Sequence, residues 1–421
     1  MINQMIEDKK NNKEWQASDV KMVVDQYTNN KIDDQAMTNW LKCIVKYGMT
    51  NEEILALTKA QLESGSILDL SKVKGIKVDK HSTGGVGDKT TLIVTPLVAS
   101  LGIPVAKMSG RALGYTGGTI DKLESIKGFN VNLSKEDFIN QVNDIKIAIT
   151  GQTPDLAPAD KKIYALRDLT GTVKSIPLIT ASIMSKKLAS GSDKIVLDVK
   201  FGNGAFCDTL EMAEELAMTM ANIGKLYGRE TVAVITDMNQ PLGMAIGNSI
   251  EVKEAINILK GKGPADLREI SIILASEMVS LAMGIDPLFA RQMVEVNIAN
   301  GKAYEKFCEW IKVQGGHLRG LVKPMLEQTL QSKVNGYIAK INTQKLGELI
   351  MELGAGRKHK DDVIDYQVGI ILQKKVGDLV KVGDLLMILR VANDITINVQ
   401  DYFEFSDSPV TKLPLVYKII K

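Results

Sequence analysis

The spacing of apolar residues changes near Gly65, and this change constrains the fold more than any other feature. From about Ser18 to Gly65 apolar residues recur at intervals of three and four, which predicts amphipathic helices, and Thr50 followed by Glu53 has the form of a capping box. Beyond Gly65, short apolar runs alternate with glycine-rich loops and helical stretches; the expected strands are 76–78, 103–107, 195–199 and 232–235. This alternation predicts an α/β fold with a mostly parallel sheet.

The domain organisation follows from the same pattern, since 421 residues exceed what one ordinary core holds. Residues 158–189 are helical in character and interrupt the series of strands, so they fit the helical unit. From residue 336 on, alternating apolar positions and Gly-Asp turns at Gly377 and Gly383 predict β-hairpins. We predict a small helical domain, a larger mixed α/β domain and a C-terminal β-rich module, with the boundaries 1–67 plus 160–191, 68–159 plus 192–335, and 336–421.

Composition and charge exclude several classes of protein. Lysine plus arginine at 52 against aspartate plus glutamate at 50 gives a net charge of +2, which is too balanced for a surface that coats nucleic acid. Cys43, Cys207 and Cys308 are far apart, which favours a reducing compartment over a disulfide framework. The first residues lack the apolar core of a signal peptide, and the most apolar run is interrupted by two prolines. We expect a cytoplasmic protein without nucleic-acid or membrane partners.

The stretch KHSTGGVGDKTT, residues 80–91, is a glycine-rich loop between an expected strand and an expected helix. Asp88 interrupts the P-loop pattern, and Thr90 stands where a dinucleotide fingerprint needs a glycine. The backbone N–H groups of residues 84–87 and the positive end of the helix could still face an anion. Further donors in this loop are Lys80, Ser82 and Thr91.

A second loop, KMSGRALGYTGGTIDKLESIKGFN at residues 107–130, also follows an expected strand. Its Thr-Gly-Gly-Thr turn allows close approach of the backbone, and it carries the donors Lys107, Ser109 and Thr119. Two such loops at the carboxyl ends of parallel strands face the same crevice. Together they make phosphate the favoured ligand.

Several stretches resemble a known family. SGRALGYTGGTIDKLE resembles the signature of the thymidine and pyrimidine-nucleoside phosphorylases, and KHSTGGVGDKTT resembles the phosphate loop of that family. The similarity continues through DLAPADKKIYALRDLTGTVKSIPLITASIMSKK, IVLDVKFGNGAF and LGAGRKHKDDVIDYQVGI. It therefore covers nearly the whole chain.

The resemblance implies a pentosyltransferase of nucleoside salvage, with inorganic phosphate as co-substrate and no organic cofactor. Uridine, thymidine or deoxyuridine and phosphate would give the free base and ribose or deoxyribose 1-phosphate. By resemblance, the α/β domain holds phosphate through Lys80, Ser82, Thr91, Lys107, Ser109 and Thr119, and the helical domain holds the base through Arg167, Ser182 and Lys186. Arg167 and Lys186 would neutralise charge on the departing pyrimidine, and a protonated His81 would donate to its O2 side.

Two further expectations come from the resemblance alone. One is a homodimer through the helical domain, with Trp40 and Met49 as candidate interface residues. The other is a bound monovalent cation such as potassium, whose shell would comprise Gly87, Lys89, Leu242, Ala245 and Glu254. Lys89 stands where relatives often have a hydroxyl residue.

The alternatives concern substrate breadth and reaction class. Tyr115 replaces a histidine of many relatives, and Phe201 stands where a smaller residue is common, so a strict thymidine phosphorylase stays open. A phosphoribosyltransferase-like enzyme would need Mg²⁺ held by acidic residues, and no Asp-Glu pair stands in the expected kind of loop. A non-catalytic nucleoside-binding protein of the same fold is disfavoured because Lys80, His81, Arg167 and Lys186 are all present.

Overall fold

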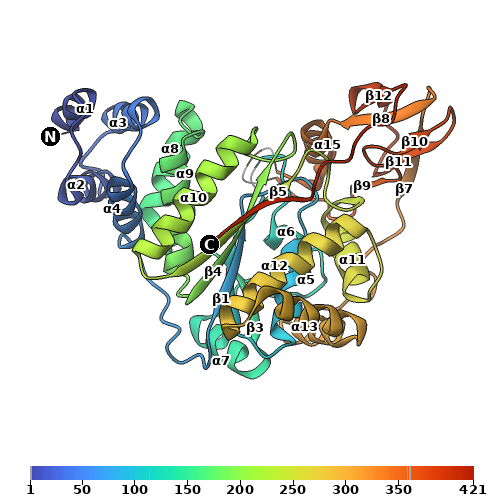
Figure 1. The fold of residues 1–421 in the computed structure, drawn as a ribbon, viewed down its shortest axis with the longest axis horizontal. Helices are drawn as coiled ribbons and strands as arrows, with labels where there is room; N and C mark the ends of the chain where they lie inside the picture. Colours follow the sequence, from blue (N-terminus) through green and yellow to red (C-terminus); the bar gives the residue numbers. More distant parts are fainter. Residues whose placement is uncertain (1, 113, 358, 360–361) are drawn as a thin grey trace.

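The computed structural model describes residues 2–112, 114–357, 359 and 362–421, and Figure 1 shows N-terminal helices, a central sheet and a strand-rich C-terminal region. The helices are α1 (Ile2–Lys10), α2 (Ala17–Thr28), α3 (Asp34–Tyr47), α4 (Asn51–Leu62), α5 (Thr90–Ala99), α6 (Thr119–Glu124), α7 (Lys135–Ile145), α8 (Pro158–Thr170), α9 (Ile176–Ala189), α10 (Leu210–Leu226), α11 (Asn248–Leu259), α12 (Ala265–Met283), α13 (Pro287–Ala299), α14 (Lys302–Val313), α15 (Thr343–Ile350), η1 (Met351–Ala355) and η2 (Val399–Asp401). The strands are β1 (Val78–Ser82), β2 (Val105–Ser109), β3 (Ile147–Gly151), β4 (Lys194–Phe201), β5 (Glu230–Asp237), β6 (Ala245–Gly247), β7 (Leu326–Gln331), β8 (Gly336–Ile341), β9 (Gly369–Leu372), β10 (Leu379–Val380), β11 (Leu385–Val391), β12 (Phe403–Ser406) and β13 (Val416–Ile420).

The central sheet confirms the predicted α/β fold. β1, β4 and β5 are parallel, with Val78 opposite Lys194 and Lys194 opposite Glu230. β2 and β3 form a second parallel pair beside β1. β3 was absent from the expected strands, although IAIT is a short apolar run.

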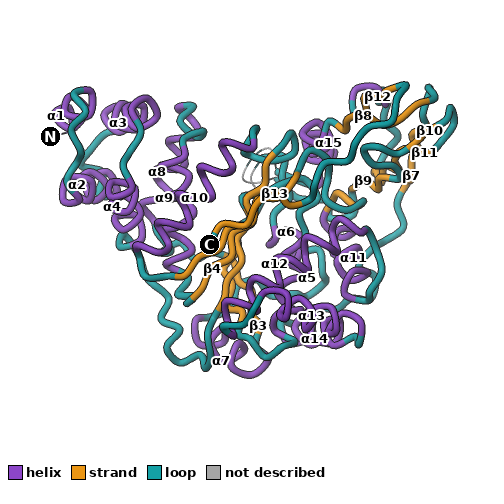
Figure 2. Tube along the Cα trace, viewed as in Figure 1, coloured by secondary structure: helices purple, strands orange, loops and turns teal. Residues whose placement is uncertain are grey.

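The last strand departs from the predicted organisation. β13 leaves the C-terminal region and pairs antiparallel with β5, at the edge of the central sheet. Figure 2 shows it in the same band of strands as β4. The end of the chain therefore belongs structurally to the α/β sheet, because an exposed edge of β5 offers unpaired backbone groups that a strand can satisfy.

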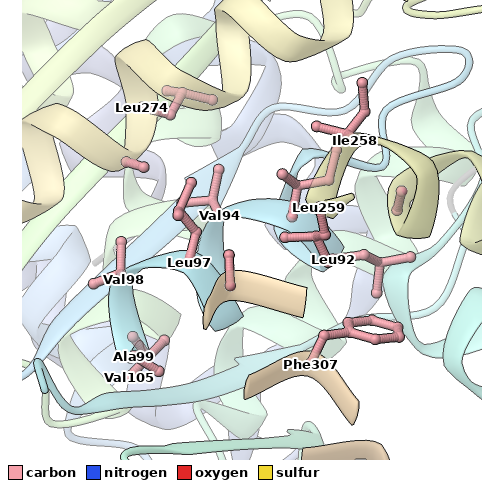
Figure 3. Packing of buried hydrophobic residues seen from close by; sticks show 14 of the residues in the cluster. Leu92, Val94, Leu97, Val98, Ala99, Val105, Ile258, Leu259, Leu274 and Phe307 are labelled. Carbon is pink, nitrogen blue, oxygen red and sulfur yellow. The ribbon is translucent and has the colours of Figure 1, made fainter. Parts of the chain in front are cut away.

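The sheet lies between two hydrophobic cores, because successive side chains along each strand point to opposite faces. Val196, Val232 and Val234 face the core that contains α5, α11, α12, α13 and α14, whereas Ile195 and Leu197 face the core that contains α10. Figure 3 shows the side chains of α5 packed among those of α11, α12 and α14. Burial on both faces rigidly fixes the strand ends that carry the two glycine-rich loops.

Among the described helices, none is by itself long and apolar enough to span a membrane; α12 and α13 reach that length and apolar character only together, as a pair bent by 118°.

The N-terminal helices share one core with α8 and α9, as Ala56, Leu57, Ile163 and Ala181 illustrate. This packing joins segments that are about a hundred residues apart in sequence. It agrees with the predicted insertion of residues 160–191 into the helical unit, although the boundaries themselves remain predictions.

The capping box of α4 is confirmed. Thr50 Oγ1 accepts from the Glu53 N–H at 3.4 Å, and Glu53 Oε2 accepts from the Thr50 N–H at 2.7 Å. Glu53 also accepts from the Trp15 N–H at 2.7 Å and pairs with Lys9 Nζ at 2.5 Å.

Trp40 is not available for the predicted subunit interface. Its side chain is fully buried and stacks on Trp15, with ring centroids 5.2 Å apart. Met49 is only partly buried, so the structure leaves that candidate open. The family resemblance made Trp40 a candidate but could not say whether its side chain faces its own core or a partner.

The C-terminal region forms two small sheets, β6-β9-β11-β7 and β10-β8-β12. Gly377 and Gly383 adopt positive φ values of 87° and 90°, as the predicted turns require. Because β6 comes from the segment after β5, this region is tied directly to the α/β domain.

Candidate active site

A cavity of about 540 Å³ lies between the carboxyl ends of β1, β2 and β3 and the helices α8 and α9. Its wall includes nearly every side chain predicted to bind phosphate or base. The structure brings together there His81, Ser82, Thr91, Lys107, Ser109, Thr119, Arg167, Ser182 and Lys186. Residues from six separate elements therefore meet at the edge of the sheet where parallel strands end.

Of the predicted phosphate ligands, Lys80 is the one that does not line the cavity, as far as the described residues define its wall. Its ammonium is fully buried beneath the loop, where it donates to Thr90 Oγ1 at 2.6 Å and lies 3.1 Å from Asp198 Oδ2. Neighbouring strand residues point to opposite faces, so His81 reaches the cavity side and Lys80 does not. In this structure Lys80 positions the loop.

Backbone N–H groups in residues 84–87, which the sequence predicted to face an anion, form hydrogen bonds inside the protein. The Gly84 N–H donates to Ser82 Oγ, and the Val86 N–H donates to the Gly204 carbonyl, both at 3.1 Å. These two N–H groups are therefore engaged inside the protein. The cavity wall still offers side-chain hydroxyls and Lys107, whose Nζ also donates to Asp79 at 3.2 Å and to the Lys80 carbonyl.

The carboxylate of Asp121 holds the second loop in place. Asp121 accepts from the Ala112 N–H at 2.7 Å and from Arg111 at 3.1 Å. A Cβ on Gly118 would lie 2.1 Å from the Ala112 nitrogen, so this turn requires glycine. Lys122 donates to the Asp88 carbonyl at 2.7 Å and thereby ties the two glycine-rich loops together.

Beneath the cavity, Asp79 lies between two lysines. Its carboxylate contacts Lys107 Nζ at 3.2 Å and Lys187 Nζ at 2.7 Å, and this pairing outweighs burial and lowers the pKa of Asp79. Burial, with the positive charges of Lys187 and Lys80, lowers the pKa of Lys107 to about 7 despite Asp79. Lys107 therefore exchanges its proton near neutral pH, and an incoming anion would favour the protonated form.

His81 faces the same cluster of charge. Burial and the nearby ammonium groups of Lys187, Lys107, Lys80 and Lys186 hold the pKa of His81 well below its ordinary value. The prediction of a protonated His81 is therefore not supported for the phosphate-free protein. A neutral imidazole retains one N–H donor, so hydrogen bonding to a pyrimidine oxygen stays possible.

Arg167 is buried at the junction of α8 and α9. Its guanidinium donates to the carbonyls of Val173 at 2.8 Å, Leu178 at 3.1 Å and Thr172 at 3.4 Å. Burial lowers its pKa, with Asp160 opposing this effect. Arg167 thus fixes the turn between the two helices while its side chain lines the cavity.

Lys186 and Ser182 lie one helical turn apart on α9, and Lys186 has a partner on α8. Lys186 Nζ donates to Ser182 Oγ at 2.9 Å and forms a close ion pair with Asp160. Sequence reasoning missed Asp160, although it stands in the first turn of α8 within the stretch PADKK. Oδ1 of Asp160 is buried without a hydrogen-bond partner among the described residues, so the carboxylate can still accept from a ligand.

Tyr115 and Phe201 lie outside the cavity wall as far as the described residues define it. Tyr115 donates to the Ala205 carbonyl at 3.2 Å and packs against the C-terminal core. Phe201 is buried edge-on against Tyr417, with ring centroids 4.7 Å apart. Any effect on substrate choice would therefore be indirect.

The residues expected to hold potassium come together on the far side of the phosphate loop. Lys89 Nζ itself lies among their oxygen atoms, 2.9 Å from the Leu242 carbonyl, 2.7 Å from the Ala245 carbonyl and 2.6 Å from Glu254 Oε2. Glu254 and Glu251 outweigh burial and raise the pKa of Lys89, so the group is an ammonium ion. The donor set is already neutralised, and these residues do not fit a metal ion.

Comparison with known proteins identifies two matching family models and several close relatives. A family model described as "Glycosyl transferase family, a/b domain" matches residues 74–304, and one described as "Pyrimidine nucleoside phosphorylase C-terminal domain" matches residues 337–398. The chain is 50% identical to a pyrimidine-nucleoside phosphorylase of Staphylococcus haemolyticus, over 99% of this chain and 98% of the relative. Proteins of the same name from Geobacillus stearothermophilus and Bacillus subtilis are 48% and 53% identical, over 98% and 90% of both chains respectively.

A solved structure supports the fold alone. An anthranilate phosphoribosyltransferase from Thermus thermophilus superposes with a TM-score of 0.59 at 17% identity, covering 73% of this chain and 98% of that one. The sequence relatives, in contrast, extend over nearly the full length, including the C-terminal region. The chain therefore belongs to the pyrimidine-nucleoside phosphorylase family.

Proposed function

We propose that this protein catalyses the reversible phosphorolysis of pyrimidine nucleosides by inorganic phosphate. The carrying observation is that one cavity joins two sets of groups: the hydroxyls and Lys107 at the ends of β1 and β2, and Arg167 and Lys186 on α8 and α9. The first set suits a small oxyanion. The second set suits the polar edge of a pyrimidine.

The phosphate half has chemistry that fits orthophosphate. Ser82, Thr91, Ser109 and Thr119 can each donate a hydrogen bond, and a protonated Lys107 supplies positive charge. Because the pKa of Lys107 is about 7, a dianion that binds there would draw a proton onto it. The phosphate is then held at a fixed position for attack on the sugar.

In the reaction, a phosphate oxygen forms a bond to C1′ while the bond from C1′ to N1 of the base breaks. The electron pair of that bond passes to the pyrimidine, and its charge spreads onto the ring oxygens. Lys186 and Arg167 would stabilise this charge, and Ser182 and His81 can each donate a hydrogen bond. Asp160 would orient Lys186, since their ion pair fixes the ammonium on the wall of the cavity.

The geometry also weighs against a phosphoribosyltransferase reaction, despite the similar fold. Asp88 and Asp160, the carboxylates in the cavity wall, each lie within ion-pair distance of a lysine. Such pairing leaves them poorly suited to hold a diphosphate through Mg²⁺. A strict thymidine phosphorylase remains the narrower alternative for substrate choice.

A base-release assay tests the proposal. Purified protein is incubated with uridine, thymidine or deoxyuridine, with and without orthophosphate, and free base is quantified; parallel samples contain a free pyrimidine and 5-phosphoribosyl diphosphate. We expect release only with phosphate. Release from thymidine but not uridine would favour the strict enzyme, and the absence of phosphate-dependent release from all three would refute the proposal.

We further propose a cytoplasmic homodimer with the domain boundaries given above. Cys43, Cys207 and Cys308 are free thiols, which suits a reducing compartment. The helical region exposes Met22 and Val45, apolar side chains that a partner subunit could cover. Light scattering of the purified protein gives the oligomeric state directly.

A further inference from the structure

Lys89 occupies a site that is built from oxygen atoms of a distant segment. It stands between the glycine-rich loop and α5, and its side chain crosses to residues 242–245 and to Glu254 on α11. The side chain is fully buried, and all three of its oxygen contacts lie between 2.6 and 2.9 Å. One carboxylate and two carbonyls around a single positive charge form the kind of shell that also suits a small monovalent cation.

The segment around this ammonium is folded to fit it. Glu254 also accepts from the N–H groups of Met244 at 3.0 Å and Ala245 at 3.2 Å, so the carboxylate orders the same turn whose carbonyls face Lys89. Gly243 has a φ of 73°, and a Cβ there would lie 2.4 Å from Glu254 and 3.2 Å from Lys89 Nζ. The space around the ammonium is closed on that side by backbone.

The neighbouring charges are balanced without any added ion. Lys375 Nζ lies 3.0 Å from Asp266 and donates to the carbonyls of Gly243 and Pro241. Lys89 and Lys375 thus offset Glu254 and Asp266 around the same turn. A further cation would meet two ammonium groups, and the next carboxylate, that of Glu251, already pairs with Lys122 Nζ at 3.0 Å.

We propose that Lys89 is a covalently attached replacement for a bound monovalent cation, so that this enzyme neither binds nor requires potassium. Lys89 is then a positioning residue. It fastens the end of the phosphate loop, between Asp88 and Thr90, to the segment that leads into β6. A tethered ammonium cannot dissociate, so the loop keeps its geometry at any potassium concentration.

The first test compares the wild-type protein in potassium chloride, sodium chloride and tetramethylammonium chloride at matched ionic strength. Matching is needed because screening alone changes surface electrostatics. We expect kcat/KM and the melting temperature to be the same in all three salts. The activity readout rests on the proposed function, whereas the melting temperature does not. A wild-type melting temperature or kcat/KM that rises saturably with potassium would overturn the inference.

The second test removes the ammonium and keeps the oxygen shell. Lys89→Ser should melt below wild type in tetramethylammonium chloride and should regain stability as potassium is added, because an ion that binds only the folded state stabilises it. Lys9→Ser is the matched control, since Lys9 is also buried and paired with a glutamate, but among the described residues its Nζ has Glu53 as its one oxygen partner. Its loss of stability should be the same with and without potassium.

The outcomes separate clearly. Recovery of Lys89→Ser by potassium, but not of Lys9→Ser, supports the inference, whereas equal behaviour of the two variants contradicts it. If Lys89→Ser does not fold in either salt, the wild-type comparison still decides. If the wild-type protein shows no phosphorolysis but is stable independently of potassium, the proposed function fails while the assignment of Lys89 stands.

Discussion

Sulfate binding should weaken about tenfold between about pH 6 and pH 8, because Lys107 loses its proton over this range. Lys107 lines the cavity and its pKa is about 7 as a result of burial near Lys187 and Lys80. Sulfate is a useful probe because its charge stays constant through this interval, whereas that of phosphate changes. Any pH dependence of sulfate binding in this range therefore comes from groups of the protein that gain or lose a proton.

The magnitude follows from a single titrating group. If only protonated Lys107 binds sulfate well, the apparent dissociation constant scales as one plus ten to the power of pH minus pKa. With a pKa of about 7, this factor is about 1.1 at pH 6 and about 11 at pH 8. At pH 7 the free site is half protonated, so binding should take up about half a proton. We expect little contribution from His81, because burial and the nearby lysines hold its pKa well below its ordinary value.

Isothermal titration calorimetry measures both quantities. Sulfate is titrated at constant ionic strength across the pH range, and at pH 7 in two buffers with different ionisation enthalpies, which gives the proton uptake. The Lys107→Gln variant should bind sulfate weakly and with little dependence on pH. Lys161→Gln removes a different positive charge from the cavity wall and should keep the wild-type slope.

A flat pH profile in the wild-type protein would refute the reasoning, as would a proton uptake near zero at pH 7. A steep profile that persists in Lys107→Gln would assign the proton to another group. A flat profile or zero proton uptake would mean that Lys107 keeps one protonation state through this pH range.

Three further predictions concern the site. Lys186→Ala should lower kcat/KM by about a hundredfold, as for loss of a charge aimed at the leaving group, and near-normal steady-state kinetics with uridine or thymidine would remove Lys186 from the site. His81→Asn should reduce the pH dependence of stability. In the wild type, the imidazole takes up a proton below about pH 6.5 in the unfolded state but not in the folded state. As the pH falls below about 6.5, urea denaturation should therefore show the free energy of unfolding decreasing more steeply than in the variant, by up to about 1.4 kcal/mol per pH unit. Tyr115→His should change the ratio of kcat/KM for uridine and thymidine by less than about threefold, because Tyr115 lies outside the cavity wall, and a larger change would place it in contact with substrate.

Local sequence determined much of the architecture. The alternation of apolar runs and glycine loops predicted the parallel sheet, and Thr50 with Glu53 correctly marked the start of α4. These features depend on neighbours within a few residues, so short-range periodicity reports them reliably. The hydroxyls of the two loops also reached the cavity, because the carboxyl ends of parallel strands meet at one edge of a sheet.

Contacts between distant segments decided the rest. Lys80 and His81 are adjacent in sequence, yet the pleat of β1 sends one beneath the loop and the other toward the cavity. Trp40 packs on Trp15, and Lys89 enters a shell of oxygens more than 150 residues away along the chain. Residue type and spacing thus identified groups able to bind an anion, and the family resemblance named a cation shell. Whether each charge faces a ligand or another part of the protein depends on which segments the tertiary fold brings beside it.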